Sequence, residues 1–155
     1  MNIISLEQAN TIIAAIFRKS RELNLRPMSA VVVEPGNIVK AFAKEDHASA
    51  LRLEMALGKT YAALALGRSS SLVQVRAQER PMFMQFVDEA SNGQIFAEGG
   101  GRLIRSLDGD VVGAVGVTGD RQNVDEDVAK FGIQSAGLKT DEDCAELGQI
   151  IRLDN

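Results

Sequence analysis

Residues 109–119 read Gly-Asp-Val-Val-Gly-Ala-Val-Gly-Val-Thr-Gly and predict a strand that lies beneath another part of the molecule. The four valines between positions 111 and 117 favour an extended, half-buried backbone. Gly113 and Gly116 interrupt them, and a strand interior tolerates glycine poorly unless a backbone, a helix or a ligand comes close. We therefore expect either a helix or a ligand to pack directly over this strand, which Gly119 ends.

Turn signals around this strand predict an antiparallel sheet. Asp108-Gly109 is a strong hairpin signal that joins the strand to the one before it. Pro35-Gly36-Asn37 separates two further extended runs in the same way. Five strands are expected in all, at 28–34, 38–44, 94–97, 102–107 and 111–118. Because hairpins join neighbouring strands, we expect all five in one antiparallel sheet.

Helical patterns lie between and beyond the strands. Ser5 and Gln8 match a capping box at the start of the first helix. The segment 72–91 is helical or irregular, and Pro81 suits the first turn of a short helix within it. The expected helices span about 5–24, 48–66, 82–90, 125–136 and, more weakly, 140–151. The fold class is therefore α/β in the α+β sense, with helices packed on the sheet.

Length and composition limit the functions to be considered. The 155 residues predict a single domain spanning 1–155. The net charge of −4 is spread over interspersed residues, which argues against a nucleic-acid surface. No apolar run approaches the roughly 18 residues of a membrane span, so no membrane partner is expected. The single cysteine, Cys144, can form no intrachain disulfide, and a cytoplasmic location fits best.

The only histidine, His47, stands where a strand gives way to a helix, beside Glu45 and Asp46. It is either an exposed residue or a functional one, as a haem-iron or metal ligand or a proton carrier. A structural zinc site usually needs four cysteine or histidine ligands, and this chain has one of each.

Other side chains also allow two interpretations. Lys59 shares a helix face with Arg52. This basic face is either solvated or able to hold an anion. Asp125-Glu126 either favour the positive end of a helix or form a catalytic pair. The segment 81–86 is dense in soft apolar side chains and indicates core or a subunit interface.

Two blocks of the chain resemble the GlcG/HbpS-like family, also described as haem-degrading or DUF336 proteins. The first block is similar to the family's strand, Asp-x-Gly-Gly turn, Ala-Phe strand and A-x-x-K helix, and comprises 31–37, Ala41-Phe42, Asp46, Ala48, Ala56 and Lys59. The second is similar to its G-G-x-P-I, G-A-I-G-V-S-G and D-E-x-x-A motifs, and comprises Gly100-Gly101, Ile104, Gly109, 113–119, Asp125-Glu126, Ala129 and Gly132. The chain departs from the pattern at Glu34 to Asn37, at His47 for glycine, at Leu103 for proline and at Thr118 for serine.

The resemblance implies a profilin-like or PAS-like five-stranded antiparallel sheet flanked by helices. It also implies homo-oligomers. The family includes the C-terminal domain of PduO-type corrinoid adenosyltransferases. Some members bind haem or corrinoid, some are linked to redox sensing, and many are encoded beside catabolic operons.

We therefore expect a cytoplasmic, self-associating protein that binds a small molecule, with haem or another tetrapyrrole as the first candidate, in a catabolic or redox pathway. His47 is the expected iron contact, Lys59 could pair with a propionate, and Thr118 and Gly116 are further binding candidates. No catalytic residue is assigned. The alternative is a small enzyme acting on an organic acid, in which Lys59 or Arg52 would hold the carboxylate. His47 or Glu126 would then move the proton.

Overall fold

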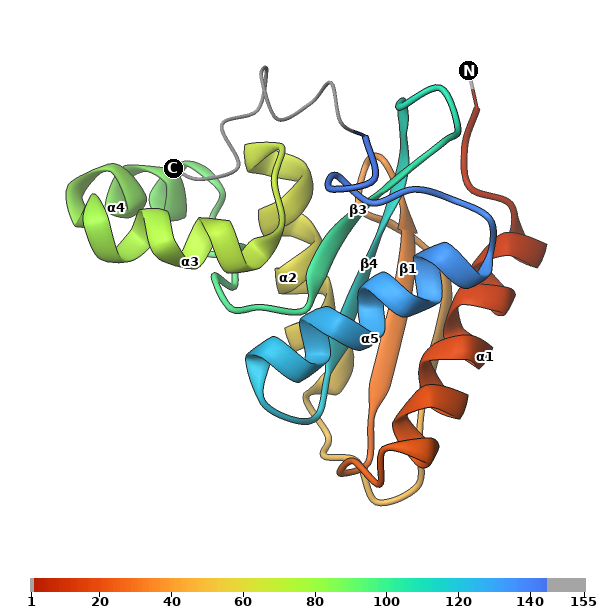
Figure 1. Cartoon of the computed structure of the whole chain (residues 1–155). Coiled ribbons are helices and arrows are strands. Elements are labelled where there is room, and N and C mark those ends of the chain that lie inside the picture. Colours follow the sequence, from red (N-terminus) through yellow and green to blue (C-terminus); the bar gives the residue numbers. More distant parts are fainter. Residues whose placement is uncertain (1, 145–155) are drawn as a thin grey trace.

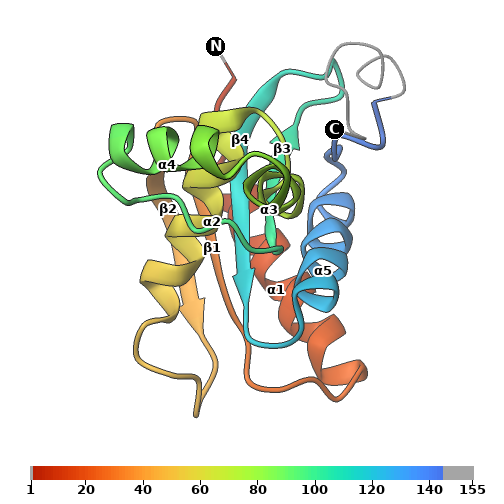
Figure 2. The same ribbon diagram turned by 90° about the vertical axis from the view of Figure 1, so that its left-hand side faces the viewer.

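Helices cover both faces of a four-stranded antiparallel sheet (Figures 1 and 2). The computed structural model describes residues 2–144. The strands are β1 (Ser29–Glu34), β2 (Ile38–Lys44), β3 (Gly101–Arg105) and β4 (Val111–Thr118), in the spatial order β2-β1-β4-β3. The helices are α1 (Leu6–Glu22), α2 (Arg52–Leu66), α3 (Ser70–Glu79), α4 (Pro81–Ala90) and α5 (Gln122–Ser135).

The central strand β1 is buried on both faces because helices lie above and below it. Ala30 and Val32 face the larger core cluster, which α1 and α5 complete. Val31 and Val33 face the opposite way, against Ala56 of α2. Alternate side chains of a strand point to opposite faces, so the near-continuous apolar run of β1 matches its place in the middle of the sandwich.

The helix α2 is what packs over the glycine-rich strand β4. A Cβ atom at Gly116 would collide with the backbone carbonyl of Ala56 and lie 3.0 Å from Thr60 Cγ2. Gly113 faces the other side, where its Cβ would meet Val33 and Ile4. We expected either a helix or a ligand to pack over this strand. In this structure a helix, α2, packs over Gly116.

Most predicted elements are confirmed within a few residues. Ser5 and Gln8 form the expected capping box at the start of α1. Both hairpins are present, β1 with β2 and β3 with β4. The helix expected from position 48 begins only at Arg52, which leaves a short connection after β2.

The prediction of a fifth strand at 94–97 is wrong, because this segment packs on α2 instead of joining the sheet. The Phe96 N–H donates to the carbonyl oxygen of Gly58 at 3.1 Å. A Cβ at Gly58 would lie 2.6 Å from Phe96 Cβ, so the glycine permits this close approach. An extended chain can therefore satisfy a backbone donor on a helix carbonyl as well as on a neighbouring strand.

The chain after α5 runs along the outer edge of β3. Lys139 and Arg105 exchange two backbone hydrogen bonds of 2.8 and 2.9 Å, and Arg105 Nε donates to Asp141 Oδ1 at 2.6 Å. Residues 140–144 form no helix, and the remainder of the helix expected at 140–151 lies outside the described residues. Within 2–144, no helix is both long and apolar enough to cross a bilayer.

Candidate functional site

His47 lies in the connection between β2 and α2 with its side chain exposed to solvent. Its backbone adopts φ +70°, in the left-handed region. The other non-glycine residues with positive φ in 2–144 are all asparagines, at positions 24, 37 and 92. Asparagine visits this region more readily than residues with larger side chains, because its short polar side chain bonds locally. His47 thus occupies a backbone position that glycine would adopt without strain, as does Asn37.

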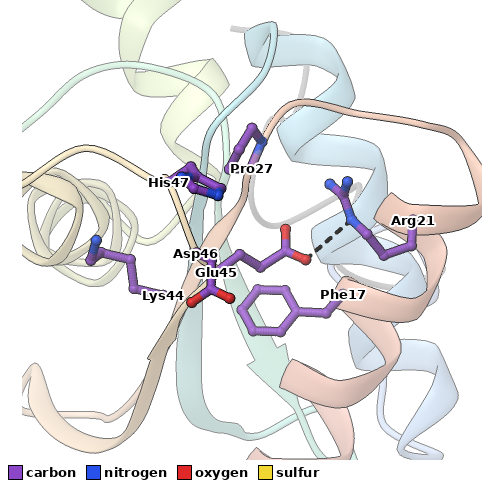
Figure 3. Close-up of a pocket in the computed structure, with 7 residues that line it drawn as sticks. All are labelled: Phe17, Arg21, Pro27, Lys44, Glu45, Asp46 and His47. Carbon is purple, nitrogen blue, oxygen red and sulfur yellow. Dashed lines mark ion pairs between the residues drawn. The ribbon is translucent and has the colours of Figure 1, made fainter.

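A pocket of about 460 Å³ opens beside His47 (Figure 3). Three segments line it: Phe17 and Arg21 from α1, Pro27 from the connection before β1, and residues 44–47 at the end of β2. Arg21 Nε pairs with Glu45 Oε2 at 3.1 Å, and Glu45 Oε1 accepts the Met28 N–H at 2.8 Å. Glu45 therefore ties α1 to the end of β2 and fixes this wall of the pocket.

The lining combines apolar, cationic, acidic and imidazole side chains. Phe17 and Pro27 supply apolar contact, His47 an imidazole, Lys44 and Arg21 cations, and Glu45 and Asp46 carboxylates. Residues 2–144 contain no group of three or more histidine, cysteine, aspartate or glutamate side chains able to hold a bare metal ion. One imidazole does suffice as a protein ligand for haem iron, because the porphyrin supplies four nitrogens itself. The lining of this pocket offers one nitrogen ligand, beside the carboxylates of Glu45 and Asp46.

Lys59 is placed very differently, in the interior between α2, β4 and α5. Its side chain is 2% exposed. The ammonium donates to the Val117 carbonyl oxygen at 2.9 Å and lies 3.4 Å from Asp125 Oδ2. Burial lowers the pKa of Lys59, and the charge of Asp125 opposes that shift. Burial likewise raises the pKa of Asp125 to about 6 against the opposing charge of Lys59.

Asp125 also holds the turn between β4 and α5. Its two carboxylate oxygens accept the backbone N–H groups of Asp120 at 2.9 Å and Gly119 at 3.3 Å. One carboxylate thus joins the end of β4, the start of α5 and the middle of α2. Lys59 and Asp125 thus form a buried ion pair that stabilises the fold, and the ammonium is turned away from solvent.

Thr118 and Gly116 lie with Lys59 at the contact of α2 and β4, and His47 does not. Gly116 is covered by α2, and Thr118 is nearly buried. Arg52 Nη1 donates both to the Thr118 carbonyl oxygen at 2.7 Å and to that of Pro27 at 2.9 Å. Since Pro27 lines the pocket beside His47, Arg52 connects the two regions.

The carboxylate of Glu126, like the ammonium of Lys59, is already bonded to groups of the protein. Its carboxylate accepts the Gly100 N–H at 2.6 Å and the Ser71 hydroxyl at 2.8 Å, and it lies 3.7 Å from Arg102 Nε. Its side chain forms part of the wall of a second hollow of about 580 Å³ at the start of α5. Of the residues considered for an organic-acid enzyme, Lys59, Arg52 and Glu126 therefore serve protein partners in this structure, and His47 is exposed.

Sequence reasoning missed the walls of the His47 pocket and the partner of Lys59. Phe17 and Arg21 lie about 30 positions before His47, and no local pattern links them. A signal for the burial of Lys59 did exist. Its neighbours one turn away on the helix include Met55, Ala56, Ala62 and Ala63, none of which is charged. A cation among such neighbours indicates a buried ion pair with a distant carboxylate.

Comparisons with known proteins agree with this fold. The structure of PduOC in complex with haem has a TM-score of 0.78 at 19% identity, covering 89% of this chain and 98% of that one. Protein ORFY of Klebsiella pneumoniae gives 0.79 at 23% identity, covering 88% and 92%. A double mutant of HbpS from Streptomyces reticuli gives 0.73 at 19%, covering 86% and 87%. No curated protein matches the sequence at a significant level.

The family assignment rests on the sequence itself. The family model described as haem degrading protein HbpS-like matches residues 4–134, which is most of the chain and covers the described helices and strands from α1 to all but the last residue of α5. The matched region contains His47 and its pocket as well as the Lys59–Asp125 pair. The chain belongs to the HbpS-like family.

Proposed function

We propose that this protein binds haem, or a related tetrapyrrole such as a corrinoid, in the pocket beside His47. The observation that carries this proposal is the exposed imidazole held at φ +70° over a pocket with apolar walls at Phe17 and Pro27. Residues held in sparsely populated backbone regions cluster at functional sites, where surrounding structure sustains the strain. The haem complex of PduOC, which shares this fold, supports the choice of ligand.

His47 is the residue that would bind the iron. When bound, haem would supply the iron together with four nitrogens of its own, and the His47 imidazole would supply a further nitrogen ligand. Phe17 and Pro27 would cover part of the macrocycle and exclude water from it. The fixed carboxylate of Glu45, together with Asp46, would stabilise the cationic metal centre by its negative charge.

The propionate partner would be Lys44. Lys44 is one of the lining residues, and its ammonium donates to the Ala48 carbonyl oxygen at 2.7 Å, from which it would turn to meet a propionate. Lys59, the partner suggested by sequence alone, would first have to leave Asp125 and the protein interior. Thr118 and Gly116 would contribute indirectly, by fixing the α2–β4 contact from which Arg52 holds Pro27 in place.

We further propose a cytoplasmic, self-associating protein that accompanies a catabolic or redox pathway. The single cysteine supports a reducing compartment. The exposed apolar side chains of α4 support self-association. A mass at micromolar concentration of at least twice 16.7 kDa is the expected result, and a monomer would contradict this part of the proposal.

The test of binding is a haemin titration of the purified protein followed by its visible absorption spectrum. Wild-type protein is expected to shift the Soret band and saturate at one haemin per chain. His47→Asn keeps a residue suited to φ +70° and removes the imidazole, so we expect the affinity to fall about tenfold or more, equivalent to about 1.4 kcal/mol.

Two controls complete the experiment. Cobalamin added in place of haemin tests whether a corrinoid is the preferred tetrapyrrole. Because His47 is the only histidine of the chain, no other side chain can supply the lost imidazole, and external imidazole should therefore restore the Soret band of His47→Asn. An unshifted spectrum in wild type, or equal affinity in the variant, would contradict the assignment.

A further inference from the structure

The hollow of about 580 Å³ between α3 and the start of α5 shares no lining residue with the pocket beside His47. Ser71 and Gln74 of α3, Gly99 of the connection before β3, and the N-cap and first turns of α5 line it. Every side chain in this lining ends in an amide, a hydroxyl or a charged group. The volume is in the range of small-molecule sites, and a ligand that fills this α3–α5 hollow must be polar.

A buried carboxylate forms a fixed part of the wall. The side chain of Glu126 is 10% exposed. Its Oε2 accepts the Gly100 N–H at 2.6 Å, and its Oε1 accepts the Ser71 hydroxyl at 2.8 Å. Because each carboxylate oxygen carries two lone pairs, both oxygens can still accept a further hydrogen bond. Glu126 therefore offers a ligand a hydrogen-bond acceptor whose position the protein already holds.

The amide of Gln122 is held in a similar way. Its Oε1 accepts the Gly99 N–H at 2.9 Å, so the amide oxygen is engaged. The amide NH₂ group remains as a donor in the lining of the hollow. Gln122 and Glu126 stand one helical turn apart on α5, so a positioned donor lies near a positioned acceptor.

The other side chains of the lining are not engaged by the protein. Within residues 2–144, no hydrogen bond or ion pair is formed by the side chains of Gln74, Arg121, Asn123 and Asp127. The two amides can donate and accept, the guanidinium can only donate and the carboxylate can only accept. Charges of both signs are present, so the lining favours neither a free anion nor a free cation.

We propose that the α3–α5 hollow binds a small neutral polyol, such as a monosaccharide or a sugar alcohol. A hydroxyl group donates and accepts at a single oxygen, which is what neighbouring donors and acceptors in the wall require. One hydroxyl can donate to Glu126 while the next accepts from the Gln122 amide. Because these two protein groups are positioned before the ligand arrives, binding costs little ordering of side chains. This site is separate from the proposed haem site and does not depend on it.

The test is a titration of the full-length protein with D-glucose, D-mannitol and glycerol, followed by proton–nitrogen NMR spectra. The side-chain NH₂ signals of Gln74, Gln122 and Asn123 report directly on the hollow. We expect these signals to shift and to saturate with at least one of the three polyols. Sodium lactate and glycine, as an anion and a zwitterion of small size, should bind more weakly.

Variants at the hollow locate the site. Gln74→Ala and Asn123→Ala each remove an amide that has no partner in the described part of the protein, so both should fold. Each should weaken polyol binding at least about threefold, as expected for the loss of one hydrogen bond. Gln78→Ala is the matched control, because Gln78 lies one turn further along α3, is exposed and does not line the hollow. It should bind as wild type does.

Each result decides one part of the proposal. The absence of saturable shifts with all three polyols would overturn it. Binding of lactate or glycine as tightly as the polyols would overturn the class of ligand. Equal affinity in wild type, Gln74→Ala and Asn123→Ala would overturn the location. Haemin affinity should be unchanged in Gln74→Ala, so failure of the polyol site and failure of the haem site are seen separately.

Discussion

Lys59 and His47 show how differently two basic side chains of one chain can be placed. Lys59 is enclosed by α2, β4 and α5, and its ammonium serves Asp125 and the Val117 carbonyl oxygen. His47 stands in solvent on a left-handed backbone, above a pocket built from three segments. The motif residue Lys59 thus stabilises the fold, and the residue that departs from the family pattern is the one that a ligand can reach.

The glycines of β4 should be the least tolerant positions in the interior region. Gly116→Ala adds one carbon where the Ala56 carbonyl of α2 already lies, so we expect it to lower the free energy of unfolding by about 3 kcal/mol. Urea denaturation measures this. Gly36→Ala is the control, because its new carbon would meet only the Ile38 side chain, at 3.5 Å or more, and it should change stability little. A tolerated Gly116→Ala would contradict the close packing of α2 on β4.

The Asp125 carboxyl should give this interior region a pH dependence. Its pKa is raised to about 6 by burial, so the folded state binds the proton more tightly than the unfolded chain does. The stability that this proton contributes is present below about pH 4 and is lost as the pH rises through 6. Asp125→Asn cannot titrate there. From pH 4 to 7 we therefore expect the wild type to lose about 2 kcal/mol relative to this variant.

Urea unfolding of both proteins across this pH range gives the comparison. Asp127→Asn, an exposed neighbour on α5, is the matched control and should follow the wild type. Parallel stability curves for wild type and Asp125→Asn would show that Asp125 titrates at its ordinary pKa, and would contradict the effect of burial on this carboxyl.

Replacing His47 in the pocket should raise the stability of the protein, whereas replacing Gly116 in the interior should lower it. Asparagine occupies the other left-handed non-glycine positions described, and so His47→Asn should raise the free energy of unfolding by about 0.5 kcal/mol without haemin present. Thermal and urea unfolding measure the change. A loss of stability would mean that the imidazole makes a structural contact, which would weaken its assignment as a ligand.

The sequence predicted the local elements well and the long-range contacts poorly. The capping box at Ser5, both hairpin turns and the close approach at Gly116 follow from local chemistry, and all are present. Residues 94–97 pack on α2 because of Gly58, which lies far earlier in the chain. Its carbonyl oxygen accepts the Phe96 N–H. The pairing of Lys59 with Asp125 and the pocket wall from Phe17 likewise arise only from tertiary packing, which local periodicity does not encode.

The most direct test compares haemin binding by variants of the two regions in one titration series. His47→Asn alters the pocket, and Thr118→Val alters a nearly buried side chain at the α2–β4 contact while keeping its shape. We predict that His47→Asn loses about tenfold or more in haemin affinity and that Thr118→Val binds as tightly as wild type. Weakened binding in Thr118→Val, with His47→Asn unaffected, would place the ligand over β4 and contradict the account.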